Sequence, residues 1–408
     1  MMREGQLTRT ARKRVLMLLE NNPFLIDVRP RREAQALLRA GYRVSVIAPR
    51  GPSGRVFEVV DGVHVYEFPS PPEAHGFLGY LWEYGYATLV MSTMSLVVLL
   101  REGFDILHAH NPPDTFFPAA VFYKLLGKRF VYDHHDLAPE LYGARFTSGG
   151  PRGGLVHDVL VLFEKLTCRL ADHVIVTNES SRQMAIGRGR VPPDQITIVR
   201  NGPDLTVFRP MQSDPTLRAK AETIIGYAGR MGTQDGLDYL LKAMRVLVHD
   251  LGRREVLCIL VGEGEAVPHL RLLAQELDIE KYLWFVGWVP QAQIPYYLSA
   301  ADICVAPEPS NPYNDRSTMI KIMEYMALEK PTVAFDLPEH RVSAGDAALY
   351  ARPNDERDLA RLIALLIDDP ERRRMMALAG RQRVETQLAW MHEEKHLLQV
   401  YETVCAGR

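Results

Sequence analysis

Short apolar runs alternate with stretches of helical spacing along the whole chain. Helical spacing is found, for example, over 33–40, 115–126 and 155–170. In the first half the β-rich runs are VLMLLE (15–20), RVSVIAP (43–49), HVYEF (64–68), DILHAH (105–110), RFVYD (129–133), HVIVT (173–177) and ITIV (196–199). Strands that alternate with helices in this way form parallel sheets with right-handed crossovers.

A second set of the same kind follows a Pro-, Asp- and Asn-rich junction at 201–216. Its runs are TIIGYA (223–228), VLCILVG (256–262), LWFVG (283–287), DICVAP (302–307) and PTVAFD (331–336). We therefore predict two Rossmann-like, doubly wound α/β domains, 1–205 and 206–387. The second ends in two amphipathic helices over 355–387, and a last helix over 388–408 follows it.

One apolar stretch, YATLVMSTMSLVVLL (86–100), has 15 residues. A membrane-spanning helix needs about 20 apolar residues. We therefore expect a buried core helix here. The alternative is an apolar surface that docks on a membrane.

Charge and cysteine content exclude several classes of protein. Lys and Arg number 48 against 50 Asp and Glu, for a net charge of −2, so no whole-protein field attracts nucleic acid. The four cysteines show no CxxC spacing, which fits a reducing cytosol. The basic N-terminal stretch lacks the apolar region of a secretory signal. A cytoplasmic protein without a nucleic-acid partner is the expectation.

Ligands of open parallel sheets bind outside the carboxyl ends of the strands, and two such edges that face each other make a cleft. After the first strand, Asp27 and Arg29 crowd the start of a helix together with Arg31 and Arg32. A helix N-terminus with arginines attracts anions, so this loop is either an anion site or a solvated charged turn.

Histidines gather after two other strands of the first domain: His108, His110, His134 and His135, with Asp136 beside them. The spacing of His108 and His110 turns both rings to one face of a strand. No acidic or cysteine ligand stands at zinc-site spacing, so we expect no metal here. A histidine that hydrogen-bonds a ligand hydroxyl fits better.

Two glycine-containing turns follow strands of the second domain, GRMGTQDG (229–236) and VGEGEA (261–266). Small residues let the backbone approach a phosphate, and Arg230 can donate two hydrogen bonds to it in a bidentate pair. Neither turn matches GxGxxG, which disfavours a nicotinamide cofactor.

A polar loop over 308–319 leads into a helix expected from about Ser317, with Asn314 or Asp315 as its cap and Thr318 as a further hydroxyl. Lys321 and Glu324, three residues apart, share one helical face. This pair is either an ordinary surface ion pair or a ligand-facing stripe on an otherwise apolar helix.

Taken in order, several segments of the chain resemble the retaining glycosyltransferases of family four, which have the GT-B architecture. The segments are DILHAHNPPD, VYDHHDLAPELY, VIVTNESSRQM, VRNGPDLTVFRP, YAGRMGTQDGLDYLLKAM, LVGEGE, FVGWVP and STMIKIMEYMALEKPTVAFD. The resemblance covers nearly the whole length. It implies that the last helix crosses back onto the first domain.

The resemblance also assigns roles. Arg230 matches the arginine that grips the donor diphosphate, and Glu324 matches the glutamate that holds the ribose hydroxyls. His135 is expected near the donor sugar. The strand end 285–287, with Val286, matches the base-binding segment. Gly229, Gly262 and Glu263 complete the expected donor site.

Two departures from the family pattern change this picture. Asp235 stands where the family has a lysine, and Arg316 stands where it has the first glutamate of E-x7-E. Lys321 is our candidate replacement for the missing lysine. The groups at hand for the donor sugar are Asn314, Asp315, Ser317 and Thr318. These changes resemble a variant branch with a QDG motif, linked to bacterial surface polysaccharide assembly, and they are also compatible with a weak or inactive enzyme.

The resemblance implies transfer of a sugar from a nucleotide diphosphate sugar, with UDP as the first choice, and with retention at the anomeric carbon. No DxD motif follows a strand, so a metal-independent reaction is expected, with the nucleotide sugar as a substrate and no cofactor. The rivals are a nucleotide-sugar epimerase, an inactive nucleotide-sugar-binding protein and a nicotinamide-dependent oxidoreductase.

A lipid-linked glycan is the acceptor we expect first. Five basic residues near the N-terminus and the apolar stretch 86–100 suggest contact with the inner face of an anionic membrane. The basic residues are Arg3, Arg9, Arg12, Lys13 and Arg14. A frayed tail and a core helix explain the same residues. The oligomeric state stays open.

Overall fold

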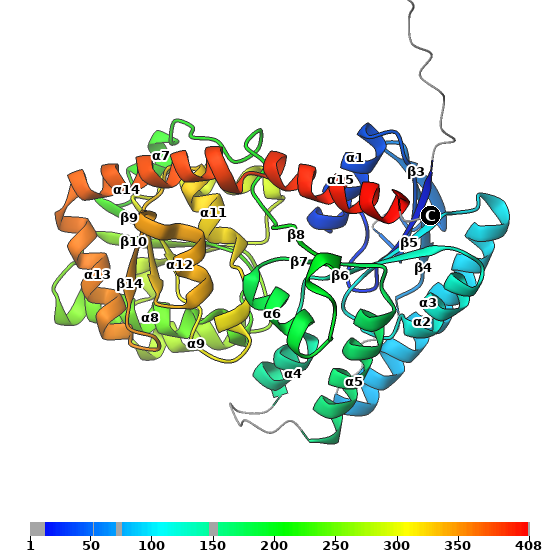
Figure 1. Cartoon of the computed structure of the whole chain (residues 1–408). Coiled ribbons are helices and arrows are strands. Elements are labelled where there is room, and N and C mark those ends of the chain that lie inside the picture. Colours follow the sequence, from blue (N-terminus) through cyan, green and yellow to red (C-terminus); the bar gives the residue numbers. More distant parts are fainter. Residues whose placement is uncertain (1–12, 52, 71–75, 147–153, 407–408) are drawn as a thin grey trace, which may run out of the picture. The chain divides into compact units, whose positions relative to one another are not determined.

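The computed structural model describes residues 13–51, 53–70, 76–146 and 154–406, and the chain forms two compact units (Figure 1). The first unit comprises 1–141, 151–199 and 394–408, and the second comprises 142–150 and 200–393. Besides the excursion that begins at Tyr142, the chain passes between units after Val199 and after Glu393; the predicted boundaries were after residues 205 and 387.

The first unit is built on an eight-stranded sheet in the order β3-β4-β2-β1-β5-β6-β7-β8. Every pairing is parallel except that of β3 with β4. The strands are β1 (Arg14–Leu18), β2 (Arg43–Pro49), β3 (Phe57–Val60), β4 (Val63–Phe68), β5 (Ile106–His110), β6 (Arg129–His134), β7 (His173–Val176) and β8 (Ile196–Ile198). All seven predicted runs are confirmed as strands, six of them within one residue at each end and VLMLLE within two.

Helices cover both faces of this sheet. They are α1 (Val28–Arg39), α2 (Gly76–Arg101), α3 (Phe117–Leu125), α5 (Leu155–Leu170) and α6 (Glu179–Gly187). Helix α4 (Ala138–Phe146) begins in the first unit, and its residues from Tyr142 belong to the second. On one face, buried residues of α2, α3 and α5 join the sheet in a single apolar core. On the other face lie α1 and the end of the last helix, α15 (Trp390–Ala406), whose Leu397, Val400 and Tyr401 are buried. The part of α15 from Glu394 belongs to the first unit.

The expectation of a buried core helix over 86–100 is wrong. These residues lie in α2, which buries one stripe formed by Ala87, Met91, Ser95 and Val98. The opposite side is exposed and apolar, with Leu89 at 69% and Leu100 at 86% exposure. By length and composition α2 could cross a membrane, over Tyr84–Arg101, where 22% of the window is buried. Core helices of soluble proteins also pass this test, so the finding alone places nothing in a membrane.

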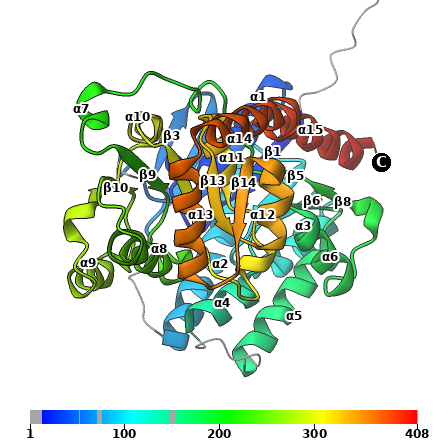
Figure 2. The ribbon, with the colours of Figure 1, turned by 90° about the vertical axis from the view of Figure 1, so that its left-hand side faces the viewer.

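The second unit is built on a six-stranded, wholly parallel sheet in the order β11-β10-β9-β12-β13-β14 (Figure 2). The strands are β9 (Thr223–Ala228), β10 (Val256–Val261), β11 (Leu283–Gly287), β12 (Ile303–Ala306), β13 (Thr332–Phe335) and β14 (Ala348–Ala351). The chain order reverses between β9 and β12, where parallel sheets of this type bind ligands. Gly226 lets α10 approach β9, because a Cβ there would lie 2.9 Å from the side chains of Ala301 and Leu298.

Two apolar cores enclose the second sheet. One involves α8, α9, α13 and Met376 of α14, and the other involves α10, α11 and the turn 384–388 that follows α14. The helices are α7 (Pro215–Arg218), α8 (Leu237–Arg245), α9 (Val267–Glu276), α10 (Ile294–Ser299), α11 (Ile320–Ala327), α12 (Pro338–Ala344), α13 (Glu356–Asp368) and α14 (Pro370–Arg383). The predicted pair of helices over 355–387 is confirmed as α13 and α14.

Candidate functional site

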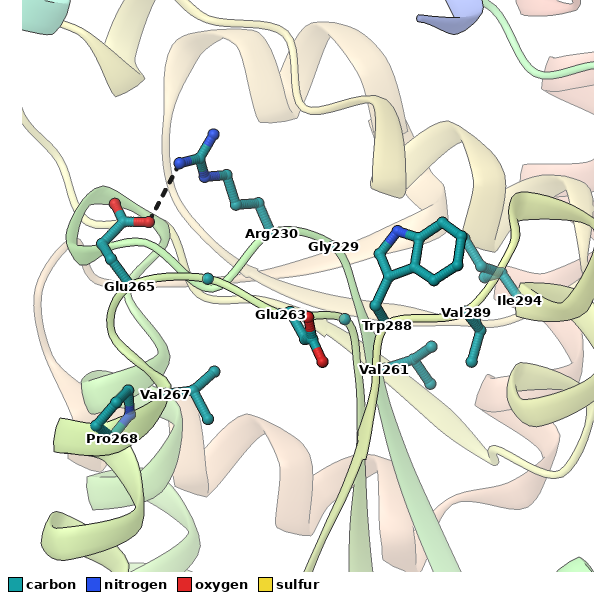
Figure 3. Close-up of a pocket in the computed structure, with 12 residues that line it drawn as sticks. Gly229, Arg230, Val261, Glu263, Glu265, Val267, Pro268, Trp288, Val289 and Ile294 are labelled. Carbon is teal, nitrogen blue, oxygen red and sulfur yellow. Dashed lines mark hydrogen bonds and ion pairs between the residues drawn. The ribbon is translucent and has the colours of Figure 1, made fainter. Parts of the chain in front are cut away.

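A pocket of about 880 Å³ opens at the carboxyl edge of the second sheet, in the loops after β9, β10 and β11 (Figure 3). Its lining combines two glycine turns with the start of α9 and an apolar wall. The lining residues are Gly229, Arg230, Val261, Gly262, Glu263, Gly264, Glu265, Val267, Pro268, Trp288, Val289 and Ile294. The sequence predicted Gly229, Arg230, Gly262 and Glu263 at a ligand site, and the structure brings these four together.

The two glycine turns are held against each other by backbone hydrogen bonds. The N–H of Met231 donates to the carbonyl of Glu263 (2.9 Å), and the N–H of Ala266 donates to the carbonyl of Met231 (3.0 Å). A Cβ on Gly262, whose φ is +131°, would lie 1.9 Å from the carbonyl oxygen of Gly229. Glycine is therefore required at position 262 so that the two turns can approach each other. The backbone of the two turns forms the floor of the pocket.

Arg230 lies at the pocket rim, and its side chain is 62% exposed. It forms an ion pair with Glu265 on the second turn, at 3.2 Å. Figure 3 shows the guanidinium above the glycine floor, on the side of the pocket opposite Trp288. An exposed ion pair of this kind is weak, so Arg230 can exchange Glu265 for an anionic ligand at little cost.

The apolar wall was not predicted. Trp288, 64% exposed, stands with Val289 just after β11, and Ile294 follows at the start of α10. The side chain of Val286 packs partly buried against the core. The role expected for the segment 285–287, which is to bind the base largely through backbone groups, stays a prediction. Alternation along the strand turns Val286 inward, so the side chains on the pocket come from the residues after it.

Lys321 lies beneath the glycine floor instead of lining the pocket. Its Nζ donates to the hydroxyl of Tyr227 (3.0 Å) and to the carboxylate of Glu308. Burial lowers the pKa of Lys321, but Glu308, Tyr227 and Asp235 together raise it well above its usual range. The ammonium is charged, and buried carboxylates already balance that charge.

Asp235, the residue that replaces the family's lysine, is part of the same turn. Its carboxylate accepts a hydrogen bond from the N–H of Gly232 (2.8 Å). Burial raises the pKa of Asp235, and Lys321 opposes the shift. The acidic side chain is therefore used to shape the turn after β9, with Lys321 as its countercharge.

The helix predicted from Ser317 begins later, and the predicted cap is wrong. Helix α11 begins at Ile320, and Met319 at its N-cap offers no side-chain hydrogen bond. Asn314 and Asp315 belong to a short 3-10 turn that ends when Ser317 adopts an extended conformation. Asn314 is fully buried and donates to the carbonyls of Gln234 (2.9 Å) and Pro309 (2.8 Å), so its amide is used to join two loops.

The remaining residues of this loop also contact the protein itself. Asp315 accepts from the hydroxyl of Ser310 (3.2 Å), and Ser317 donates to the carbonyl of Tyr313 (2.8 Å). Thr318 reaches Glu339 at 3.5 Å. Glu324 is half-buried on α11 and, within the described residues, is not among those that line the pocket. Roles for these four residues at the donor stay predictions.

In the first unit, Arg29 turns inward instead of marking a surface anion site. Helix α1 starts at Val28, after Asp27, which makes no side-chain cap. The guanidinium of Arg29, 5% exposed, donates to both carboxylate oxygens of Asp133 at 2.8 and 3.0 Å. It also lies 3.2 Å from Glu33. The helix pattern could not show this, because the partner is on β6.

Histidines and carboxylates share this buried region. His108, His110, Glu33 and Asp133 are at most 3% exposed, and one ligand atom from each lies within 4.8 Å of the others. Burial raises the pKa of Glu33 well above its usual range. Burial also favours a neutral Asp133, but Arg29 and two histidines hold the pKa of that carboxyl well below its usual range.

His135, predicted near the donor sugar, lies just beyond the carboxyl end of β6. Its side chain is 20% exposed, and its Nδ1 is 3.4 Å from Asp133. Burial lowers the pKa of His135, but Asp133 outweighs it and the net shift is upward. The backbone N–H of His135 donates to Asn111 (2.8 Å), which fixes the turn after the strand.

Two doubly wound units, one with a glycine-floored pocket and a basic rim at its sheet edge, place the chain among two-domain α/β proteins that bind ligands at the carboxyl ends of parallel strands. Family models for "Glycosyl transferases group 1" and "Glycosyl transferase 4-like domain" match residues 222–369 and 26–202. Together these models match well over half of the chain, which belongs to this family of glycosyltransferases with the GT-B fold.

Known proteins support the same assignment. The chain is 28% identical to alpha-maltose-1-phosphate synthase of Mycolicibacterium smegmatis over 303 residues, which is 69% of this chain and 75% of that protein. Its fold matches sucrose-phosphate synthase of Thermosynechococcus elongatus with a TM-score of 0.79 at 20% identity, over 97% and 100% of the two chains. It also matches Anabaena HepE, solved with UDP-glucose, with a TM-score of 0.70 at 19% identity, over 96% and 99%.

Proposed function

We propose that the protein transfers a sugar from a UDP-sugar to a glycan or lipid-linked glycan, with retention at the anomeric carbon, in the assembly of cell-surface polysaccharide. The observation that carries the proposal is the pocket after β9, β10 and β11, with its backbone floor, apolar wall and exposed arginine. The structure of HepE with UDP-glucose, on the same fold, supports the choice of donor.

The pocket offers a distinct partner to each part of a nucleoside diphosphate. Trp288 and Val289 provide an apolar surface for the base. Arg230 at the rim provides two parallel donors for the diphosphate. Helix α9 begins at the pocket with Val267 and Pro268, so its positive end adds to the attraction. These groups need no metal ion, and we propose a metal-independent reaction.

In the proposed reaction the bond from the anomeric carbon to the UDP oxygen breaks, and a bond to the acceptor oxygen forms on the same face. The proton of the acceptor hydroxyl passes to the departing phosphate oxygen, and UDP leaves. Arg230 stabilises the charge that develops on this leaving group. Lys321 contributes by supporting the Gly229 turn from below. Glu324 is proposed to hold the ribose, and the role of His135 stays a prediction.

A catalytically weak or inactive nucleotide-sugar-binding protein is the second candidate. The observation that favours it is the engagement of Lys321 with Glu308, because a balanced charge assists a leaving diphosphate less than a free one. Such a protein would bind UDP-sugar without releasing UDP. A nucleotide-sugar epimerase would convert the donor without any acceptor.

We propose a cytoplasmic protein that contacts the inner face of a membrane. The exposed apolar side of α2 supports this, with Leu89, Leu96, Val97 and Leu100 on one surface. Of the basic residues expected to help, Arg3, Arg9 and Arg12 lie outside the described residues. Lys13 donates to the carbonyl of Cys405 (3.1 Å) and Arg14 to that of Glu102 (2.6 Å). Co-sedimentation with anionic vesicles should fall for Leu89→Ser/Leu100→Ser and persist for Leu272→Ser, an exposed leucine of the second unit.

The first test is a thermal-shift panel with UDP, GDP, TDP, ADP, CMP and NAD, each with and without magnesium. A selective, magnesium-independent shift with UDP is expected, because a ligand that binds only the folded state stabilises it. UDP-sugars are then incubated with glycan and polyprenyl-linked acceptors, UDP release is measured, and the anomeric configuration of the product is read by NMR. A shift with NAD alone, or a product of inverted configuration, would overturn the proposal.

A further inference from the structure

The buried histidines of the first unit form a cluster that the proposed transfer reaction does not use. Glu33 comes from α1, His108 and His110 from β5, and Asp133 from β6. The register explains their meeting. His108 and His110 are two residues apart and share a face of β5, and His110 lies directly beside Asp133 on the neighbouring strand. Helix α1 packs on that face and supplies Glu33.

Several polar atoms of this cluster are buried without a hydrogen-bond partner. They are both carboxylate oxygens of Glu33, Nε2 of His108 and both ring nitrogens of His110. Two of them still have a charged neighbour: Glu33 Oε1 lies 3.2 Å from Arg29, and His110 Nδ1 lies 3.3 Å from Asp133 Oδ2. Glu33 Oε2 lies 3.9 Å from His108 Nε2 and 3.6 Å from His110 Nε2. A buried polar atom without a partner destabilises the folded protein. The oxygen and nitrogen atoms that face one another in this dry interior repel unless a cation or a proton lies between them.

The separations suit one bound metal ion. Ligands about 2.0–2.1 Å from a tetrahedral zinc ion are about 3.3–3.4 Å apart. The separations of 3.6 and 3.9 Å from Glu33, and of 3.9 Å between His108 Nε2 and Asp133 Oδ2, exceed this by about half an ångström or less. A small inward shift of side chains closes the difference. Two imidazoles and two carboxylates are a donor set that suits zinc and related divalent ions.

Neighbouring groups hold these side chains as metal ligands are usually held. The hydroxyl of Tyr401 on α15 lies 2.7 Å from His108 Nδ1, which turns Nε2 toward Glu33. Arg29 fixes Asp133 through two hydrogen bonds. Outer partners of this kind orient metal ligands in known sites. Arg29 also supplies one positive charge against two carboxylates, so the cluster still has room for a cation.

We propose that Glu33, His108, His110 and Asp133 bind one divalent transition-metal ion, zinc being the ion that this donor set fits best. All four positions are taken by protein, so the site is structural and leaves no open position for a substrate. It would join α1, β5 and β6. The proposal departs from the sequence-based expectation of no metal, which rested on spacing along the chain. It is independent of the proposed transfer reaction, since the pocket is in the second unit.

The test is the zinc content of the full-length protein, purified without a metal-binding tag and measured by plasma mass spectrometry. About one zinc ion per chain is expected for a closed four-ligand site. Glu33→Gln and His110→Asn should each reduce the content more than tenfold. Glu102→Gln and His64→Asn are matched controls, because they alter a carboxylate–histidine pair 2.7 Å apart in the same unit, and they should retain the metal.

Two measurements on the unaltered protein keep the proposal falsifiable if a variant fails to fold. Treatment with 1,10-phenanthroline should lower the melting temperature, and added zinc chloride should restore it. Protein produced with cobalt chloride should show the intense visible absorption of tetrahedral cobalt. Protein with less than a tenth of an equivalent of zinc, no cobalt band and no response to the chelator would overturn the proposal, because water or a proton would then meet these atoms. Equal zinc in Glu33→Gln and the unaltered protein would also overturn it.

Discussion

The carboxyl edges of the two sheets have the same architecture and opposite character. At the first edge, Arg29, Glu33 and Asp133 are buried among histidines, and Arg29 pairs with both carboxylates. At the second edge, glycine turns make a floor of backbone, and Arg230 is exposed at an open rim. A parallel sheet therefore specifies where polar loops gather. The side chains of those loops decide whether the edge becomes a closed ionic core or a binding pocket.

The largest effect should come from removing the buried ion pairs of Arg29 with Glu33 and Asp133 at the first sheet edge, called here the closed edge. Arg29→Met should lower the free energy of unfolding by about 3–5 kcal/mol, because two buried carboxylates lose their cation. Arg341→Met is the control, since Arg341 makes a similar bidentate pair with Asp336 at the surface. It should leave the denaturation midpoint unchanged. Urea unfolding of the three proteins measures the difference. If both variants lost a similar free energy of unfolding, the ion pairs of Arg29 would contribute no more to stability than an exposed ion pair does.

A second test disturbs the contact between the two glycine turns of the pocket at the second sheet edge, called here the open edge. Gly262→Ala should destabilise the protein by at least about 2 kcal/mol, since strained backbone and a clash with Gly229 act together. Gly252→Ala isolates the backbone part, because Gly252 also has a positive φ of +70° but has nothing within 4 Å of its Cβ. Its loss should be clearly smaller. If Gly262→Ala and Gly252→Ala lowered the melting temperature equally, the contact between the two turns would contribute nothing to stability.

Sequence patterns predicted most strands well, because fully buried parallel strands are continuous runs of β-branched and apolar residues. TIIGYA and LWFVG match β9 and β11 at both ends. The strands β3 and β14 were missed, since both are short edge strands and β14 (ALYA) is half alanine. Alanine favours helices and marks no strand in a single sequence.

The two edges differ in how much of each could be predicted. The open edge follows from local signals, since Gly229, Arg230 and Gly262 directly follow strands. The closed edge depends on which face of α1 meets β5, and no spacing along the chain relates Glu33 to His108. Trp288 was missed for another reason: an apolar residue in a loop carries no chemical signature. Its position after a strand of the second sheet was the signal that could have found it.

The third prediction tests the rim of the open edge. Arg230→Ala should weaken UDP binding about 10- to 100-fold, since hydrogen bonds from a charged donor are worth about 1.5–3 kcal/mol. Uridine binding should change little, and so should stability. Arg352→Ala is the control, because Arg352 follows β14, the outer strand on the other side of the sheet from β11. Titration calorimetry with UDP and uridine compares the three proteins. Equal losses for UDP and uridine would remove the phosphate role of Arg230.

The smallest effect expected is at the apolar wall. Trp288→Ala should weaken UDP and uridine equally, by about 5- to 10-fold, because stacking of a base on an aromatic ring contributes about 1–3 kcal/mol and this ring is only partly enclosed. Trp288→Phe should recover most of the affinity, since it keeps an aromatic face. Trp82→Ala, which removes a similarly exposed indole from α2, should bind both ligands normally. A loss confined to UDP would place the indole at the diphosphate, which would reverse the order of base and phosphate along the pocket.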